Sequence, residues 1–105
     1  MKSKAATQTL LEQIRETCGF RRWRVAKFID MDQTGLKKVE VGRSRPTEQT
    51  ASALFDFYGG LVPLGLIYDT HHYSFEGWLT AHQVAKLRRR AKEISREYPD
   101  LFPDT

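Results

Sequence analysis

The fold of this chain is decided by residues 19–47, which read GFRRWRVAKFIDMDQTGLKKVEVGRSRPT. Apolar residues recur there at helical spacing and predict two short helices, over about residues 21–29 and 33–40. Asp30 can take the positive φ that a tight turn between these helices requires. Asp32 is a good N-cap for the second helix. The stretch therefore predicts a helix pair joined by a tight turn.

The same residues resemble the opening of a calcium-binding loop. The order Asp30, Asp32, Thr34, Gly35 matches the Asp-x-Asp-x-polar-Gly start of an EF-hand. Such a loop ends with a glutamate whose two oxygens close the coordination shell, and the corresponding position here is Val41. The loop cannot close around the ion, so the two carboxylates are interpreted as turn and cap residues.

Helices are also predicted on both sides of this stretch. The apolar spacing predicts helices over about residues 7–17, 47–58, a short segment after Pro63, and 81–97. Gly19 is expected to end the first of these helices, and Thr47 is expected to cap the second. Thr80 with Gln83 fits a capping box at the start of the last helix. Residues 71–79 fit a short strand and a loop equally well. The chain as a whole is expected to be all-α.

Basic residues are concentrated in the helix pair. From Arg21 to Arg45 there are eight basic and three acidic residues, an excess of +5, whereas the net charge of the whole chain is +4. Two short helices with a local basic excess are the arrangement that places a second helix in the major groove of DNA. Gln33 and Thr34, on its first turn, can donate to and accept from base edges, and Lys37 can reach guanine or phosphate.

This stretch resembles the helix-turn-helix of phage repressors, the Cro-like or Xre family. The agreement runs without a gap through Val25-Ala26, Ile29, Met31, Leu36, Val39-Glu40, Gly42 and Pro46. The resemblance covers about residues 10–69 and implies a lambda-repressor-like helix-turn-helix bundle of about five helices, to which this chain adds a C-terminal helix. We accordingly expect a DNA-binding domain over residues 1–69 and a C-terminal extension with a dimerisation helix over 70–105.

The resemblance also implies roles for individual side chains in binding double-stranded DNA. The expected base-contacting residues are Gln33, Thr34, Lys37 and Lys38, and the expected phosphate-contacting residues are Arg22, Arg24, Arg43 and Arg45. Arg15 and Glu40 match a partly buried ion pair that joins the first helix to the recognition helix.

Four positions depart from the family pattern. Arg21-Arg22 replace the usual Ser or Thr followed by Gln, so the first helix of the pair loses its side-chain cap. Gly35 replaces a bulkier residue, which either permits a closer approach to the groove or removes a contact. Trp23 stands where the family has a polar surface residue, so it could contact sugar-phosphate or a protein partner.

The last predicted helix has an apolar stripe of its own. Its apolar residues follow at alternating steps of three and four, the spacing that pairs helices along a seam. The stripe could pack on its own domain, but a dimer contact is favoured because a two-fold dimer reads an inverted repeat. The expected dimer interface consists of Trp78, Val84, Leu87, Ala91 and Ile94, joined by Tyr73, Phe75 and residues 64–68. The basic residues between 86 and 92 fit a solvated face and a flanking DNA contact equally.

Other classes of function have little support in the sequence. No cofactor or metal is expected, because His71, His72 and His82 have no Cys or carboxylate at ligand spacing. No catalytic signature is present, so the chain is not expected to be an enzyme. The lone Cys18 and the absence of a signal peptide or an apolar span predict a cytoplasmic protein without a membrane partner.

The expected function is that of a homodimeric transcriptional repressor, encoded by a bacterium, phage or plasmid, that binds an inverted-repeat operator. One alternative is the antitoxin of a toxin-antitoxin pair, which binds its own promoter and also a protein toxin. A controller protein of a restriction system or an anti-CRISPR operon is a further alternative. Only the neighbouring genes would distinguish these hypotheses about the function.

Overall fold

Helices form all the regular secondary structure in residues 8–72 and 75–103, the part of the chain that this computed structural model describes. In chain order the elements are α2 (Leu10–Cys18), α3 (Arg22–Phe28), α4 (Gln33–Glu40), α5 (Glu48–Phe57), α6 (Leu64–Tyr68), the 3₁₀ turn η1 (Thr70–His72), α7 (Phe75–Trp78) and α8 (Ala81–Glu97). The prediction of an all-α chain is confirmed. None of the described helices is long and apolar enough to cross a membrane.

The start of α2 is set by a capping box that the sequence analysis missed. The Thr9 hydroxyl accepts from the Glu12 backbone N–H at 3.3 Å, and the Glu12 carboxylate accepts from the Thr9 N–H at 3.1 Å. The helix therefore begins at Leu10, later than predicted, while Thr7 lies outside the described residues. Gly19 ends α2 with φ of +80°, as its position after the apolar stripe predicted.

The tight turn between α3 and α4 follows the predicted chemistry. Asp30 has φ of +61°, and the Asp32 carboxylate caps α4 by accepting from the Gly35 N–H at 2.5 Å. A Cβ on Gly35 would lie 3.0 Å from the Asp32 Oδ1 atom and 3.3 Å from the Met31 Cε atom. Gly35 thus leaves room for the cap and for the Met31 side chain. Arg21, at the start of α3, provides no side-chain cap, also as predicted.

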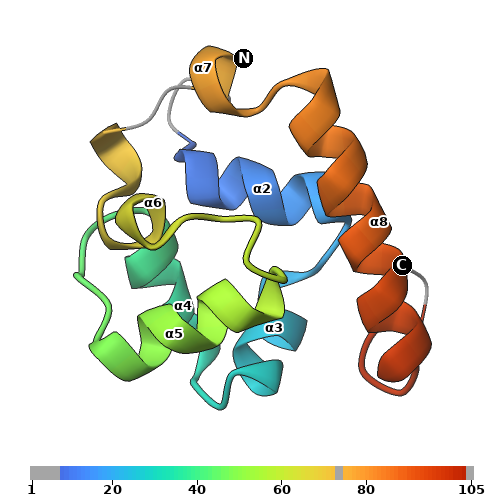
Figure 1. The fold of residues 1–105 in the computed structure, drawn as a ribbon. Helices are drawn as coiled ribbons and strands as arrows, with labels where there is room; N and C mark the ends of the chain where they lie inside the picture. The colour runs from blue at the N-terminus through green and yellow to red at the C-terminus, as the bar shows by residue number, and fades with distance from the viewer. Residues whose placement is uncertain (1–7, 73–74, 104–105) are drawn as a thin grey trace, which may run out of the picture.

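The core lies around α2, with α8 packed along one side and α3, α5 and α6 on the others (Figure 1). Its centre is an aromatic cluster that draws on distant parts of the chain. The Phe102 ring, beyond the end of α8, lies 4.8 Å from the Phe20 ring and 5.8 Å from the Phe57 ring. Phe102 is only 1% exposed, so the segment that follows α8 belongs to the same core as the helix pair.

The apolar stripe of α8 is part of this core, which corrects the expected dimer interface. Leu87, Ala91 and Ile94 are at most 3% exposed within a single chain. Their side chains face α2 and cannot reach a second molecule unless the core opens. Trp78 and Val84 are half-buried. Tyr73 and the Phe75 side chain lie outside the described residues.

Two further contacts join the later elements to α2. The Thr70 hydroxyl, in η1, accepts from the Leu11 N–H at 3.1 Å, which satisfies one of the free donors at the start of α2. The Cys18 Sγ atom lies 3.7 Å from the Leu87 carbonyl oxygen of α8, and burial raises the pKa of the Cys18 thiol to about 12. Cys18 is therefore a packing residue held in its thiol form.

Candidate nucleic-acid interface

The exposed face of α4 carries all four residues that were expected to contact bases. Leu36 and Val39 turn toward the core, and the helical period directs another row of side chains to solvent. The exposed side chains are those of Gln33, Thr34, Lys37 and Lys38. Lys37 and Lys38 also lie in the last turn of α4, where a positive charge interacts favourably with the negative end of the helix dipole. The two lysines therefore stabilise α4 in addition to any role in binding.

The loop that follows α4 adds two exposed cations. Gly42, with φ of +80°, ends the helix, and the Arg43 side chain then points to solvent without an intramolecular partner in the described part of the chain. The Arg45 guanidinium lies over the Tyr68 ring of α6, 5.3 Å from its centroid. This contact orients the Arg45 side chain but leaves it exposed. Both arginines are therefore available beside α4.

Gly42 also allows the loop to pack closely against η1. A Cβ there would lie 2.2 Å from the Nε2 atom of His71. The loop that carries Arg43 is thus held against a neighbouring element.

Arg22 and Arg24 have other partners than the expected phosphates. The Arg22 Nε atom donates to Glu40 at 2.9 Å and its Nη2 atom donates to Glu12 at 3.1 Å, while the side chain is 20% exposed. The Arg24 Nη1 atom donates to the Leu101 carbonyl oxygen at 2.6 Å, and its guanidinium stacks on the Trp23 ring at 4.7 Å. Internal acceptors and an aromatic ring engage both guanidinium groups, so we interpret Arg22 and Arg24 as internal partners in place of the expected phosphate contacts.

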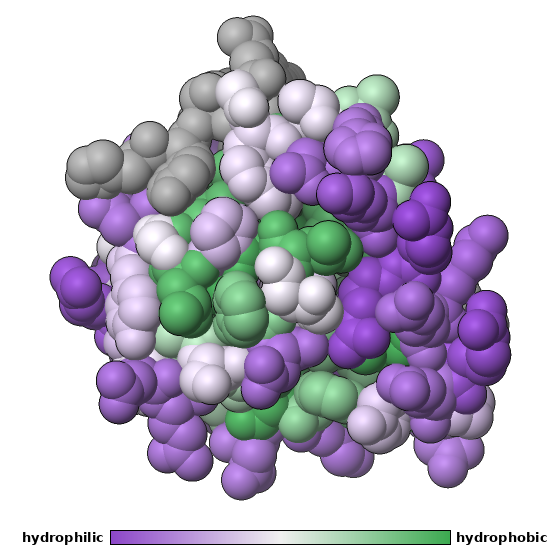
Figure 2. Space-filling view, viewed as in Figure 1, coloured by the Kyte–Doolittle hydropathy of each residue, from purple (hydrophilic) through white to green (hydrophobic). Residues whose placement is uncertain are grey.

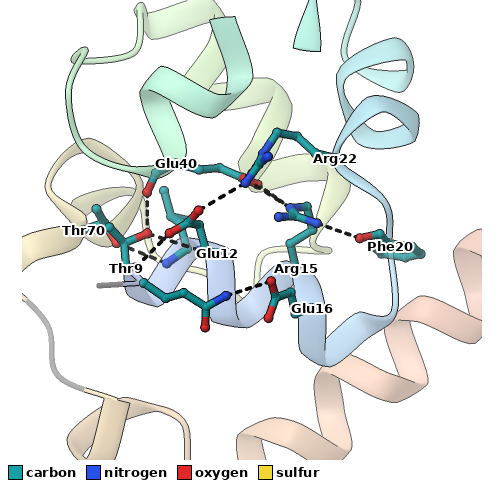
Figure 3. Close-up of polar contacts among 10 residues, drawn as sticks. Thr9, Glu12, Arg15, Glu16, Phe20, Arg22, Glu40 and Thr70 are labelled. Carbon is teal, nitrogen blue, oxygen red and sulfur yellow. Dashed lines mark hydrogen bonds and ion pairs between the residues drawn. The ribbon is translucent and has the colours of Figure 1, made fainter. Parts of the chain in front are cut away.

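The predicted ion pair between Arg15 and Glu40 is confirmed, and it belongs to a larger network (Figure 3). The Arg15 Nε atom donates to both Glu40 carboxylate oxygens at 2.9 and 3.1 Å, and its Nη1 atom donates to the Phe20 carbonyl oxygen at 2.9 Å. The Thr9 hydroxyl donates to the Glu40 backbone carbonyl. Burial raises the pKa of the Glu40 carboxyl, and the Arg15 and Arg22 guanidinium groups offset part of that rise.

This network fixes α4 relative to α2 and α3. Glu40 at the end of α4 is held by Arg15 from α2 and by Arg22 from the first turn of α3. Glu12 accepts from the Nη2 atom of the same Arg22 guanidinium. The orientation of the exposed face of α4 therefore depends on side chains that lie behind it. The Thr-x-x-Glu pattern at residues 9–12 was the sequence signal for the capping box of α2, which positions Thr9 and Glu12 in the network.

Replacing Arg22 with glutamine tests its reassignment from phosphate contact to internal partner. We expect the free energy of unfolding to fall by about 1–3 kcal/mol, because hydrogen bonds to two carboxylates are lost. The salt dependence of DNA affinity should not change, whereas the loss of a phosphate contact would lower its slope by about one. Urea denaturation and DNA titrations at several salt concentrations measure the two effects.

The exposed Arg43→Gln is the matched control for this experiment. It should change stability by no more than about 0.5 kcal/mol and lower the salt slope. If Arg22→Gln gave the pattern expected for Arg43→Gln, Arg22 would be a phosphate contact after all.

An open hollow of about 530 Å³ lies beside the start of α4. Trp23, Lys27 and Met31 form part of its wall, and Gln33 lies at its edge. Trp23 is 43% exposed, which is unusual for so large an apolar side chain. Trp23 therefore presents an exposed aromatic surface beside the start of α4.

No group of three or more His, Cys, Asp or Glu residues in the described ranges could hold a metal ion. Comparisons of the chain with protein-family models, with curated proteins and with solved structures find no significant match.

Proposed function

We propose that this chain is a sequence-specific regulator of transcription that binds double-stranded DNA through a lambda-repressor-like helix-turn-helix formed by α3 and α4. The observation that carries the proposal is the exposed face of α4, where four polar or basic side chains lie together without intramolecular partners in the described residues. Its eight residues make α4 about 12 Å long, a length that fits the major groove.

The side chains divide by the chemistry they can perform. Gln33 and Thr34 on the first turn are suited to hydrogen bonds with base edges, and Lys37 to guanine acceptors. Lys38, Arg43 and Arg45 are suited to phosphates on either side of the groove. The basic excess of the helix pair then supplies the attraction that does not depend on sequence. Repression would follow from occupation of the operator.

A homodimer is part of this proposal, because one helix of this length reads only a few base pairs. Two copies related by a two-fold axis would read half-sites about 34 Å apart. Since the stripe of α8 is buried, we propose that the dimer surface includes Leu64, which is 43% exposed, and the half-buried Leu61 and Phe55. Figure 2 shows apolar residues gathered in the middle of the face that contains the connection between α5 and α6.

Selection of bound fragments from random DNA, followed by footprinting across a salt series, tests this function. An inverted repeat spaced by whole helical turns, with affinity that falls steeply in salt, would support it. Binding without sequence preference would contradict it.

Substitutions on α4 test the assignment of the base contacts. Gln33→Ala and Lys37→Ala should each weaken binding to the selected site by about 1–3 kcal/mol while affecting random DNA less. Competition titrations against both kinds of DNA give this comparison, with Lys27→Ala on the exposed side of α3 as the matched lysine control. Equal losses for selected and random DNA would reassign the residues to phosphate contacts.

The antitoxin alternative is favoured by one observation, the exposed Trp23 ring at the edge of the hollow. Exposed aromatic residues are typical anchors of protein interfaces. A toxin gene beside this gene, together with loss of toxin binding in Trp23→Ala, would support that second function.

A further inference from the structure

Most basic residues of this chain lie in two segments. The helix pair carries an excess of +5, and α8 carries six basic and two acidic residues, an excess of +4 that equals the net charge of the whole chain. The remaining residues are therefore net acidic. Proposed DNA binding through α4 accounts for the first segment but not for the second.

Four of the α8 cations form one exposed row, which we call the basic stripe. Because Leu87, Ala91 and Ile94 face α2, the opposite side of the helix faces solvent. The basic stripe consists of Arg88, Arg89, Lys92 and Arg96. Residues 88, 92 and 96 follow one another at steps of four, so their side chains are neighbours along a length of about 12 Å. Figure 2 shows hydrophilic residues over α8 at the right of the view.

The stripe differs from its neighbour Arg90, which has internal partners. The Arg90 Nε atom donates to the Phe57 carbonyl oxygen at 3.0 Å and its Nη1 atom pairs with Glu93 at 3.1 Å, so Arg90 completes the end of α5. In the described part of the chain no hydrogen bond or ion pair engages the four stripe residues. Like charges at this spacing destabilise a helix, and a bound polyanion would reverse that effect.

Duplex DNA is the polyanion that fits the stripe best. Over about 12 Å a duplex presents roughly seven phosphate charges. A membrane surface fits less well, because a helix that lies on lipid buries its apolar face there, whereas the apolar face of α8 is already in the core. Beside Arg89, a hollow of about 320 Å³ above Leu61 and Gly59 gives the backbone of a nucleic acid room to approach.

The stripe and the exposed face of α4 belong to two helices that lie apart. Figure 1 shows α8 along the right of the molecule and α4 to the left of its centre. Each helix directs its apolar side chains into the core and its charged side chains to solvent. We propose that the basic stripe of α8 binds the backbone of a second DNA segment, so that a molecule bound through α4 bridges two duplexes. This inference rests on the proposed binding of DNA by α4.

A two-duplex capture experiment tests the bridge. Beads carry the duplex selected by the protein, the protein is bound, and a fluorescent duplex of unrelated sequence is added. The fluorescent duplex should be retained. With four phosphate contacts its affinity should fall about 50-fold between about 50 and about 150 mM salt.

Two matched variants separate the effect of the stripe's charge from other effects of substitution. The variant R88Q/R89Q/K92Q/R96Q should lose the fluorescent duplex while it keeps its affinity for the bead duplex. The charge-conserving variant R88K/R89K/R96K should retain both. Gln, Lys and Arg have similar helix propensities and the positions are exposed, so circular dichroism should show α8 intact in both variants. If the glutamine variant does not fold, R88Q/K92Q replaces it, with about half the loss in salt slope.

Several outcomes would overturn the bridge. One is retention of the bead duplex without the fluorescent one, and another is retention of the fluorescent duplex by the glutamine variant. Loss of both duplexes in the glutamine variant would mean that the stripe binds the same DNA as α4. If the protein recruited vesicles rich in phosphatidylserine but no second duplex, the stripe would be assigned to a membrane surface. If the bead duplex is not bound at all, the function proposed for α4 fails separately. Direct binding of the fluorescent duplex to the immobilised chain, lost in the glutamine variant and kept in the lysine variant, would still support the stripe.

Discussion

Replacing Glu40 with alanine is expected to lower the free energy of unfolding by about 3–5 kcal/mol. The Glu40 carboxylate accepts from Arg15 and Arg22, and the Arg15 side chain is only 7% exposed. Without Glu40 the buried Arg15 charge has no carboxylate partner, and its desolvation is no longer compensated. Because a domain of this size has about 5–15 kcal/mol of stability in total, the loss is a large share of it.

Urea denaturation followed by far-ultraviolet circular dichroism measures this effect. Glu97→Ala, on the exposed side of α8, is the control and should change stability by no more than about 0.5 kcal/mol. A loss below about 1 kcal/mol for Glu40→Ala would mean that the arginines do not depend on this carboxylate.

Placing a glutamate at Ile94 is expected to unfold the chain rather than to separate two subunits. Ile94 is fully buried, so an unpaired carboxylate there either remains buried or forces α8 away from α2. The free energy of unfolding is expected to fall by about 4 kcal/mol or more, which is in the range typical of a buried, unpaired charge. Thermal unfolding by circular dichroism should show the loss of the cooperative transition.

Ala85→Glu is the control for this substitution, since Ala85 lies on the exposed side of the same helix. It should unfold like the unchanged protein. A folded Ile94→Glu variant whose mass in sedimentation is half that of the unchanged protein would show that the α8 stripe does serve as a dimer contact.

The features that were predicted well from the sequence are local ones. Asp32 and Thr47 cap their helices, and Gly19 ends α2, because each acts on backbone groups within a few residues. The face of α4 was also predictable, since the helical period alone decides that Leu36 is inside and Lys37 is outside.

The features that were missed depend on partners far apart in the chain. The apolar spacing of α8 shows that one face is buried but does not say against what, and α2 takes the place expected for a second subunit. Arg22 was expected to contact phosphate because it matches such a position in the repressor-like pattern. Its acceptors, Glu12 and Glu40, lie 10 and 18 residues away, so no local pattern indicates them. Thr70 and Leu11 are 59 residues apart, and no local sequence pattern indicates a contact at that separation.

The position of Phe102 also bears on when the protein can fold during its synthesis. Its ring packs against both Phe20 and Phe57, so the central aromatic cluster cannot be completed until residue 102 has left the ribosome. Until then α2, α3 and α5 present apolar surface that nothing yet covers, the kind of surface that leads nascent chains to aggregate or to engage chaperones. A ribosome that pauses before this point would therefore hold a helix pair that has formed its turn and its caps but still lacks its core.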